Sequence, residues 1–473
     1  MPQNYSEALQ HRVFDVVCDI AEENGQRAYV IGGFVRDLLL GIPSKDIDIV
    51  VEGSGIRLAE AVGKKFRHSN LSVFKNFGTA MLKIGHEEVE FVGARRESYN
   101  RGSRKPIVED GSIEDDQKRR DFTINALALS LNKDTFGDLV DPFGGLEDLK
   151  NGIIRTPLEP GITFSDDPLR MLRGVRFATR LGFTIADETI EGMTRMADRI
   201  SIVSQERITD ELEKTMKTAK QPSTAWKLLD KVGLLQKILP ELSALKGVER
   251  RGSHGHKDNF YHTMQVLDGV AAQSDDEWLR WAALFHDIGK PRSKRYDEKL
   301  GWTFHNHNYI GAKMVPKIFT RLKLPLGDPM KFVVKMVDLH MRPIVLSEDE
   351  VTDSAVRRLL FEAGDDVEKL MILCEADITS KNEEKVQKYM RNFKIVRRKM
   401  KEIEEKDHIR NFQPPVSGEE IMAFFGIQPS KEVGLIKNAI KDAILDGVIH
   451  NDREEAIALM KAEGEKLGLV YRE

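Results

Sequence analysis

Two short apolar segments near the start of the chain are joined by a glycine pair and a helical stretch. Residues 28–31 (AYVI) fit a buried strand, and Gly32 and Gly33 lead into FVRDLLLG, which fits a helix ending at Gly41. A glycine pair between a strand and a helix lets backbone N–H groups approach an anion at the helix N-terminus. We expect Gly32, Gly33 and Arg36, one turn into the helix, to bind phosphate groups. A plain turn is the competing interpretation, because most glycine pairs are turns.

An Asp-x-Asp segment follows in KDIDIVV, which fits a strand. Its alternation puts Asp46 and Asp48 on one face and the isoleucines in the core. Paired carboxylates repel each other unless a cation lies between them, and two Mg²⁺ ions can activate an attacking hydroxyl and stabilise a leaving pyrophosphate. The pattern predicts catalytic Asp46 and Asp48 that hold two Mg²⁺ ions, although a solvated strand face would look the same. Glu90, on a further predicted strand, is either a third metal ligand or an edge-strand charge.

A second polar block, RRDFTIN, stands before the apolar run INALALSL, which we interpret as a helix. Polar groups at the N-terminal end of a helix are well placed to hold a ribose and a triphosphate. Arg120, Asp121 and Asn125 are therefore predicted to bind the nucleotide. A helix cap with neighbouring charges is the alternative.

Residues 164–183 (FSDDPLRMLRGVRFATRLGF) have the apolar periodicity of a helix. Asp167 and Arg170 are three residues apart, so we expect them to share a face near the helix start. Their planar donors and acceptors could contact the pairing edge of a base. Arg173 and Arg176 continue along the helix and are predicted to bind nucleotide or RNA phosphates. An ordinary ion pair between Asp167 and Arg170 is the alternative.

Seven of the 12 histidines fall within residues 254–340. One of them stands in an HDIGKP segment after the apolar stretch WAALF. Imidazole and carboxylate groups together suit a divalent transition metal or Mg²⁺, whereas a lone histidine is usually structural. The predicted ligands are His262, His286, Asp287 and Asp377, with His307 and His340 as secondary candidates.

The GGFVRD segment with Asp-x-Asp close behind resembles the polymerase-β-like nucleotidyltransferase superfamily, in its bacterial branch of class II CCA tRNA nucleotidyltransferases and poly(A) polymerases. In that family the block at 119–126 tells ribose from deoxyribose, a role that falls here on Arg120 and Asp121. The family's Glu-Asp-x-x-Arg motif selects ATP and CTP. It matches Asp167 and Arg170, although Asp166 stands where the family usually has Glu. The histidine-rich segment resembles the HD phosphohydrolase superfamily.

The resemblance implies an α+β fold. A nucleotidyltransferase head with a mixed sheet plus helices would be followed by an all-α neck, an all-α HD domain and a helical tail. The predicted domains are the catalytic head (1–155), the neck that binds RNA and the nucleotide base (156–250), the HD metal-binding domain (251–382) and the tRNA-contacting tail (383–473).

The activity implied is template-independent addition of CCA to the 3′ end of tRNA from CTP and ATP, with release of pyrophosphate. An accessory phosphohydrolase activity of the HD site is a further option. Within the family, a poly(A) polymerase or an enzyme adding only CC or only A is the alternative. From another class, the alternative is an HD phosphohydrolase or phosphodiesterase whose head holds RNA.

Cys18 and Cys374 have no ligand or disulfide spacing, and no run of about 18 apolar residues or secretory signal is visible. We therefore expect a cytoplasmic protein without a membrane partner. The net charge of −4 does not itself indicate RNA binding, which depends on local basic clusters.

Overall fold

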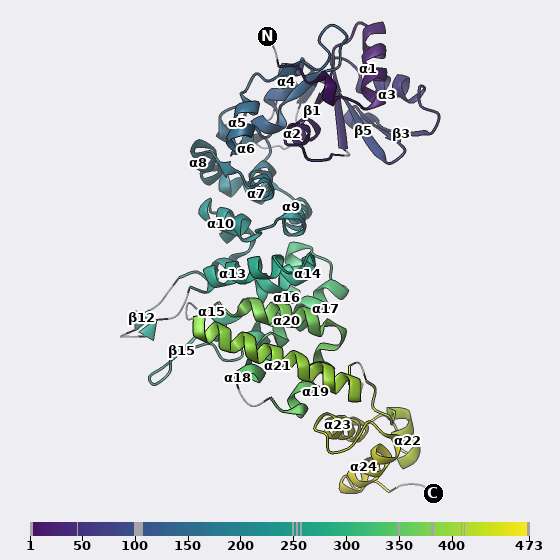
Figure 1. Cartoon of the computed structure of the whole chain (residues 1–473), viewed down its shortest axis with the longest axis vertical. Helices are drawn as coiled ribbons and strands as arrows, with labels where there is room; N and C mark the ends of the chain where they lie inside the picture. Colours follow the sequence, from purple (N-terminus) through teal and green to yellow (C-terminus); the bar gives the residue numbers. More distant parts are fainter. Residues whose placement is uncertain are drawn as a thin grey trace. The chain divides into compact units, whose positions relative to one another are not determined.

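The chain forms two compact units, Met1–Pro240 and Glu241–Glu473 (Figure 1). The border between them falls late in the predicted neck, and the four-domain division stays a prediction. The computed structural model describes residues 3–44, 46–98, 107–247, 250–251, 254–255, 258–348, 351–379, 383–407, 409–410 and 412–470.

A mixed seven-stranded sheet dominates the start of the first unit, as predicted, in the order β3-β4-β5-β2-β1-β8-β9. The pair β2 and β5 is parallel, and every other neighbouring pair is antiparallel. The strands are β1 (Ala28–Ile31), β2 (Asp46–Val51), β3 (Ser69–Phe74), β4 (Thr79–Ile84), β5 (Glu87–Gly93), β8 (Ala128–Ser130) and β9 (Leu139–Val140). A separate hairpin joins β6 (Arg95–Ser98) and β7 (Ile107–Asp110).

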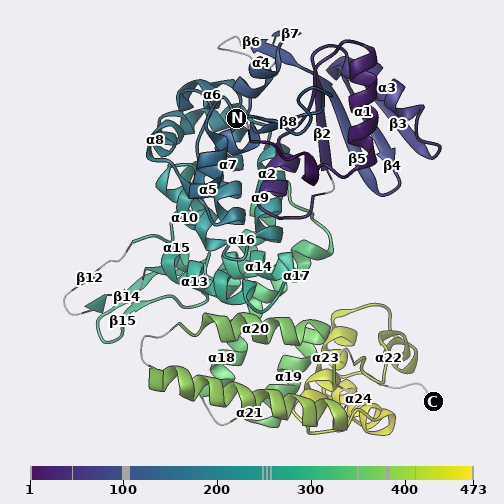
Figure 2. The same ribbon diagram turned by 45° about the horizontal axis from the view of Figure 1, so that its top comes forward.

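Helices pack against this sheet and fix which face of each strand is buried. Helices α1 (Arg12–Glu23) and α3 (Gly55–Gly63) lie side by side against it (Figures 1 and 2). Strand β2 alternates as predicted, so that Ile47 and Ile49 are buried while Asp46 and Asp48 lie on the other face. The remaining helices around the sheet are α2 (Gly33–Leu39), α4 (Ile113–Lys118) and the 3-10 helices Ser6–Ala8, Lys75–Phe77 and Thr123–Asn125.

The helix predicted over INALALSL is wrong. The chain makes the short 3-10 helix at Thr123–Asn125 and then strand β8, whose three residues are all buried. A strand that is buried on both faces has a continuous apolar run, which periodicity cannot separate from a buried helix.

The rest of the first unit is almost entirely helical. Helix α7 begins at Leu169, after Pro168, and packs against helices α9 and α10. Asp167 has extended backbone, with φ −139° and ψ 102°, and therefore precedes the helix instead of lying on its face. The elements are α5 (Gly145–Asn151), β10 (Ile153–Ile154), α6 (Pro160–Asp166), α7 (Leu169–Leu181), β11 (Thr184–Ile185), α8 (Asp187–Met196), the 3-10 helix Ala197–Ile202, α9 (Gln205–Thr218), α10 (Ser223–Lys231) and α11 (Leu235–Ile238).

The second unit is a helical array with two small hairpins. The long helix α21 buries Phe393, Val396, Met400 and Ile403, the apolar stripe of an amphipathic helix. It packs against α18 and α19 (Figure 2). No helix in the described ranges has the length and apolar character needed to cross a bilayer.

The elements from residue 240 onward are α12 (Pro240–Ser243), β12 (Arg250–Arg251), β13 (His254–Gly255), α13 (Asn259–Ala271), α14 (Glu277–Phe285), α15 (Lys290–Ser293), β14 (Arg295–Asp297), β15 (Gly301–Thr303), α16 (His307–Leu322), α17 (Asp328–Leu339), α18 (Met341–Glu348), α19 (Asp353–Ala363), the 3-10 helix Gly364–Asp366, α20 (Val367–Asp377), α21 (Glu383–Asp407), α22 (Gly418–Phe425), α23 (Lys431–Leu445) and α24 (Arg453–Lys466).

Candidate active site and metal centre

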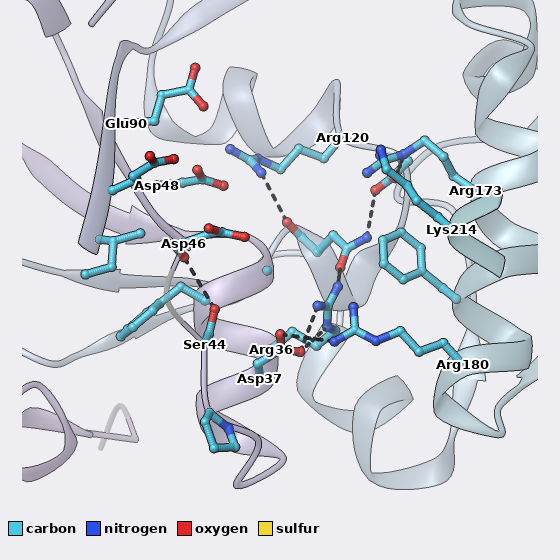
Figure 3. Close-up of a pocket in the computed structure, with 18 of the residues that line it drawn as sticks. Arg36, Asp37, Ser44, Asp46, Asp48, Glu90, Arg120, Arg173, Arg180 and Lys214 are labelled. Carbon is cyan, nitrogen blue, oxygen red and sulfur yellow. Dashed lines mark hydrogen bonds and ion pairs between the residues drawn. The ribbon is translucent and has the colours of Figure 1, made fainter. Parts of the chain in front are cut away.

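A cavity of about 710 Å³ opens in the first unit between the polar face of the sheet and helices α2, α7 and α9 (Figure 3). It brings together most of the residues predicted to bind nucleotide and metal. Those that line it are Gly33, Arg36, Asp46, Asp48, Glu90, Arg120, Asp121, Asn125 and Arg173.

Carboxylates form one wall of the cavity. Asp46 and Asp48 come from β2, and Glu90 is the register partner of Asp48 on parallel strand β5 (Figure 3). Burial raises the pKa of Asp48; the charge of Arg120 opposes the shift and that of Asp46 adds to it. Burial and then the charge of Asp48 raise the pKa of Glu90. Ionised together, the three groups require a nearby cation, and an all-oxygen donor set fits Mg²⁺.

Cationic side chains form the opposite wall. Arg173 and Arg180 come from α7, and Lys214 comes from α9 (Figure 3). Arg173 donates from Nε to Asp121 Oδ2 at 2.7 Å, while Lys214 Nζ lies 2.6 Å from Asp210 Oδ2. Although burial opposes it, the Arg173 guanidinium holds the pKa of Asp121 below its usual value. Asp121 therefore orients a cation from a neighbouring helix, and this wall suits a polyphosphate.

Gly33 lines the cavity, whereas Gly32 lies against Arg120 and Asp48. Gly32 has φ +81°, and a Cβ at this position would lie 2.8 Å from Arg120 Nη1 and 3.4 Å from Asp48 Oδ2. Gly33 starts α2 with an ordinary φ, and its nearest neighbour would be Arg36 Nη2 at 3.6 Å. Gly32 is thus required both by its backbone conformation and by the close approach of Arg120 and Asp48, whereas a Cβ at Gly33 would make only an ordinary contact.

A buried polar chain supports Arg36. Its Nη1 donates to Asn125 Oδ1 at 2.6 Å and its Nε to Asp37 Oδ1 at 2.8 Å. Asn125 in turn donates to Asp121 Oδ1 at 3.0 Å. The segment that contains Arg36 and the segment that contains Asp121 and Asn125 are far apart in sequence, yet they meet in one hydrogen-bond network.

Four predicted nucleotide-binding residues do not line this cavity: Gly32, Asp167, Arg170 and Arg176. Arg176 donates from Nε to buried Glu211 at 2.6 Å and lies over the Phe177 ring. Asp167 accepts from Arg207 at 2.9 Å and from the Leu169 amide at 3.1 Å.

Arg170 donates to the backbone oxygens of Arg119, at 2.5 Å, and of Thr163. The structure describes no ion pair between Asp167 and Arg170, so the simple pair considered as the alternative is not what holds these residues. Their base-reading role stays a prediction.

Lys214 and Asp37 also line the cavity, and neither was singled out from the sequence. Lys214 follows Asp210 at i+4, which by itself indicates only a solvated helix pair. No local signal separates it from other surface lysines, because its role comes from the packing of α9 against α7.

The predicted histidine–aspartate cluster assembles in the second unit. His262 Nε2 lies 2.8 Å from Asp377 Oδ1 and 3.5 Å from Asp287 Oδ2. His286 is fully buried, and its Nε2 makes no hydrogen bond within the described part of the chain. Burial would lower the pKa of His286, but Asp287 and Asp377 outweigh it and raise the pKa to about 10. The cluster attracts positive charge, which fits a divalent cation on mixed nitrogen and oxygen ligands.

Three family models match successive parts of the chain. They are the Poly A polymerase head domain over residues 28–155, the probable RNA and SrmB-binding site of polymerase A over residues 182–246, and the HD domain over residues 259–382.

Two relatives share the name A-adding tRNA nucleotidyltransferase. The protein from Deinococcus radiodurans is 32% identical over 442 residues, which cover 90% of this chain and 93% of that protein. The protein from Aquifex aeolicus is 36% identical over 300 residues. These cover 61% of this chain but 35% of that longer protein, so the chain matches about a third of its length.

Solved structures of related proteins share the fold. A tRNA nucleotidyltransferase complexed with a primer tRNA and an incoming ATP analog is 27% identical, with a TM-score of 0.56, covering 81% of this chain and 98% of that one. The Thermotoga maritima CCA-adding enzyme is 23% identical, with a TM-score of 0.63 and coverage of 97% and 98%, a likeness of fold alone. With a relative matched along nearly its whole length, this chain belongs to the tRNA nucleotidyltransferase and poly(A) polymerase family, in a form that carries an HD domain.

Proposed function

We propose that this protein adds AMP from ATP to the 3′ end of tRNA. The RNA 3′-hydroxyl attacks the α-phosphorus of ATP and gives up its proton. A new P–O bond forms, the bond from the α-phosphorus to the bridging oxygen breaks, and pyrophosphate leaves. The observation that carries this proposal is a cavity in which three carboxylates face a wall of arginine and lysine side chains (Figure 3).

Each wall has its own task in this reaction. Asp46, Asp48 and Glu90 hold Mg²⁺, which when bound supplies positive charge to the attacking hydroxyl and the departing pyrophosphate. Arg173 and Lys214 bind the triphosphate, with Asp121 orienting the Arg173 guanidinium at 2.7 Å. Arg120, 19% exposed and held by buried Asp116, lies beside the carboxylates and can contact the nucleotide.

The choice of AMP rests on the relatives. The D. radiodurans protein, matched over 93% of its length, is named A-adding tRNA nucleotidyltransferase. Addition of complete CCA, implied by the sequence motifs, is the second candidate. Both are consistent with Asp167 and Arg170 reading the base. Each residue would first have to exchange its present contact, Arg207 or the Arg119 carbonyl, for the nucleotide.

The test uses two tRNA substrates, one ending at the discriminator base and one ending in CC, each with ATP, CTP or both. We expect a single A on the CC-ended tRNA and no CTP incorporation on either, read by sequencing the product ends. A CCA end built on the discriminator base would instead establish the second candidate. Runs of A would indicate a poly(A) polymerase.

A pair of variants tests the chemistry independently of the substrate. Asp46→Ala should abolish incorporation while tRNA still binds in a gel-shift assay. Glu87→Ala is the matched control, because this carboxylate pairs with His11 instead of lining the cavity. Retained incorporation by Asp46→Ala would overturn the assignment of the carboxylate wall.

The buried histidine cluster supports a second activity, hydrolysis of phosphate esters at the HD site. The observation behind it is the unsatisfied, fully buried Nε2 of His286 beside two carboxylates. We expect His286→Ala to remove phosphatase or cyclic phosphodiesterase activity that Asp46→Ala leaves in place. The opposite pattern would refute it.

A further inference from the structure

The sheet face that carries Asp46 and Asp48 continues beyond Glu90. Glu90 is the register partner of Met81 on β4, and Met81 is in turn the partner of Ser72 on β3. Met81 lines the same cavity as Asp48 and Glu90. Since directly opposed residues share a face of a sheet, one face runs from Asp48 to β3, the strand at the outer edge (Figure 2).

Exposed aromatic and basic side chains occupy this edge. Phe74 follows Ser72 by two residues, so it lies on the same face, and 48% of it is exposed. The turn that follows holds exposed Lys75 and then Phe77, which is 68% exposed. Lys75 makes no ion pair or side-chain hydrogen bond with any residue that the structure describes. We call Ser72, Phe74, Lys75 and Phe77 the β3 edge surface; aromatic rings beside a free cation suit the bases and phosphates of a single-stranded nucleic acid.

Helix α3 covers the opposite face of these strands. A Cβ at Gly63, the last residue of α3, would lie 3.2 Å from Leu82 Cδ1 on β4. Val73 lies on this helix side because it alternates with Phe74 along β3. Val73 and Lys64, which follows α3, are both exposed, yet neither belongs to the β3 edge surface. They therefore provide matched controls close in sequence.

The direction of the proposed displacement decides from which side RNA enters. Pyrophosphate leaves toward Arg173 and Lys214, and the attacking and leaving oxygens lie roughly in line through the α-phosphorus. The 3′-hydroxyl therefore approaches from the side away from these cations. Figure 3 shows Asp48 and Glu90 on one side of the cavity and Arg173 and Lys214 on the other. The strands that extend the carboxylate side are β5, β4 and β3, so they support the incoming RNA.

The spacing of the strands decides which nucleotides reach the edge. Neighbouring strands lie about 4.8 Å apart, so β3 is about 10 Å from β5. Nucleotides stacked along one strand follow each other at about 3.4 Å, so this distance corresponds to about three of them. The β3 edge surface is thus in reach of the nucleotides just before the attacking end.

A second copy of the chain is the other occupant that an open edge strand could take. Antiparallel pairing of two β3 strands with Leu71 opposite Ser72 would place His68 of each copy opposite Lys75 of the other. Exposed Arg67 would lie beside them. These basic groups would repel each other across the pair, whereas a polyanion attracts all of them. Charge therefore favours RNA.

We propose that the β3 edge surface binds the single-stranded 3′ end of the RNA substrate and so positions its terminal hydroxyl at the carboxylates. Phe74 and Phe77 stack on bases, and Lys75 binds a phosphate. These are positioning residues, because none of them contacts the reacting atoms. The inference rests on the proposed nucleotide addition for the identity of the RNA, but its test requires no turnover.

Photocrosslinking locates the RNA directly. The probe is tRNA that ends in CC and carries 4-thiouridine as its discriminator nucleotide, the third from the end. The protein is the full chain with Asp46→Ala, which binds the probe without extending it. Mass spectrometry should find crosslinks within residues 69–78, and a probe with 4-thiouridine in the anticodon loop should give none there. Crosslinks confined to other peptides would overturn the proposal.

Binding measurements with the CC-ended tRNA test the side chains. Phe74→Ala should raise the Kd about tenfold, as expected for the loss of one stacked base. Lys75→Gln should reduce the slope of log Kd against log salt by about 0.7, the contribution of one phosphate contact on a single strand. Val73→Ala and Lys64→Gln should leave the Kd and the slope unchanged.

Three results would contradict the proposal. They are an unchanged Kd in Phe74→Ala, equal salt slopes for Lys75→Gln and Lys64→Gln, and an altered oligomeric state of Phe74→Ala with unchanged RNA affinity, which would assign the edge to a second copy. Circular dichroism checks folding, and if Phe74→Ala does not fold, the crosslinks and Lys75→Gln decide. Failure of the proposed function looks different, because the unmodified chain would then incorporate no nucleotide.

Discussion

Replacing Gly32 by alanine should damage both the stability and the chemistry of the head, whereas the same change at Gly33 should spare its stability. Gly32 has φ +81° and ψ −134°, a backbone region that is essentially restricted to glycine. Forcing another residue there costs about 1–3 kcal/mol. The added Cβ would also lie 2.8 Å from Arg120 Nη1, so the guanidinium would have to shift. At Gly33, with an ordinary φ and 3.6 Å of clearance, alanine in a helix gains up to about 1 kcal/mol.

Hydrogen exchange of full-length protein measures this difference locally. Peptides covering β1 and β2 should exchange faster in Gly32→Ala, corresponding to an opening free energy lower by about 1–3 kcal/mol, and should be unchanged or slower in Gly33→Ala. The kcat for nucleotide incorporation should fall sharply in Gly32→Ala. If both variants protect β1 and β2 equally and incorporate equally, the conformational argument for Gly32 is wrong.

Three further predictions concern the two walls of the cavity. Glu90→Gln should raise the Mg²⁺ concentration for half-maximal incorporation about tenfold, which corresponds to a binding free energy weaker by about 1.4 kcal/mol. The control Glu87→Gln should leave this concentration unchanged, and equal Mg²⁺ dependence of the two variants would exclude Glu90 as a ligand. Lys214→Ala should raise the KM for ATP about tenfold and change kcat less. Lys217→Ala, one turn away, is the control and should leave the KM unchanged; an unaffected KM in Lys214→Ala would exclude Lys214 from triphosphate binding. The raised pKa values of Asp48 and Glu90 mean that protons compete with Mg²⁺ at higher pH than for ordinary carboxylates. Incorporation at low Mg²⁺ should therefore decline as pH falls, and added Mg²⁺ should restore it; pH profiles that coincide at low and high Mg²⁺ would contradict this.

Local patterns were enough to predict the strand that carries Asp46 and Asp48. The alternation in β2 predicted which side of the sheet carries Asp46 and Asp48, and the strand before Gly32 and the helix after it form as expected. Period-two patterning fixes the face of a strand regardless of what packs above it. The same reasoning failed for INALALSL, where burial on both faces removes the alternation.

Residues placed by tertiary packing could not be predicted in the same way. Arg173 and Arg176 both looked like phosphate ligands on one helix, but only Arg173 reaches the cavity, because buried Glu211 holds Arg176 at 2.6 Å. The register of β5 against β2, which brings Glu90 beside Asp48, likewise depends on strands far apart in sequence.

The cationic wall has a consequence for how such a chain can be divided or recombined. The matched head model ends at residue 155, yet Arg173, Arg180 and Lys214 all come from helices beyond it. A fragment cut at that border would keep the acidic half of the cavity and lose most of the positive half. Exchanging heads between relatives would therefore transfer only part of the cavity lining. The helices that were not exchanged would still determine the affinity for the phosphates of a nucleotide. In this architecture, a chimera could therefore take its sheet from one relative and most of the cavity's cationic wall from another.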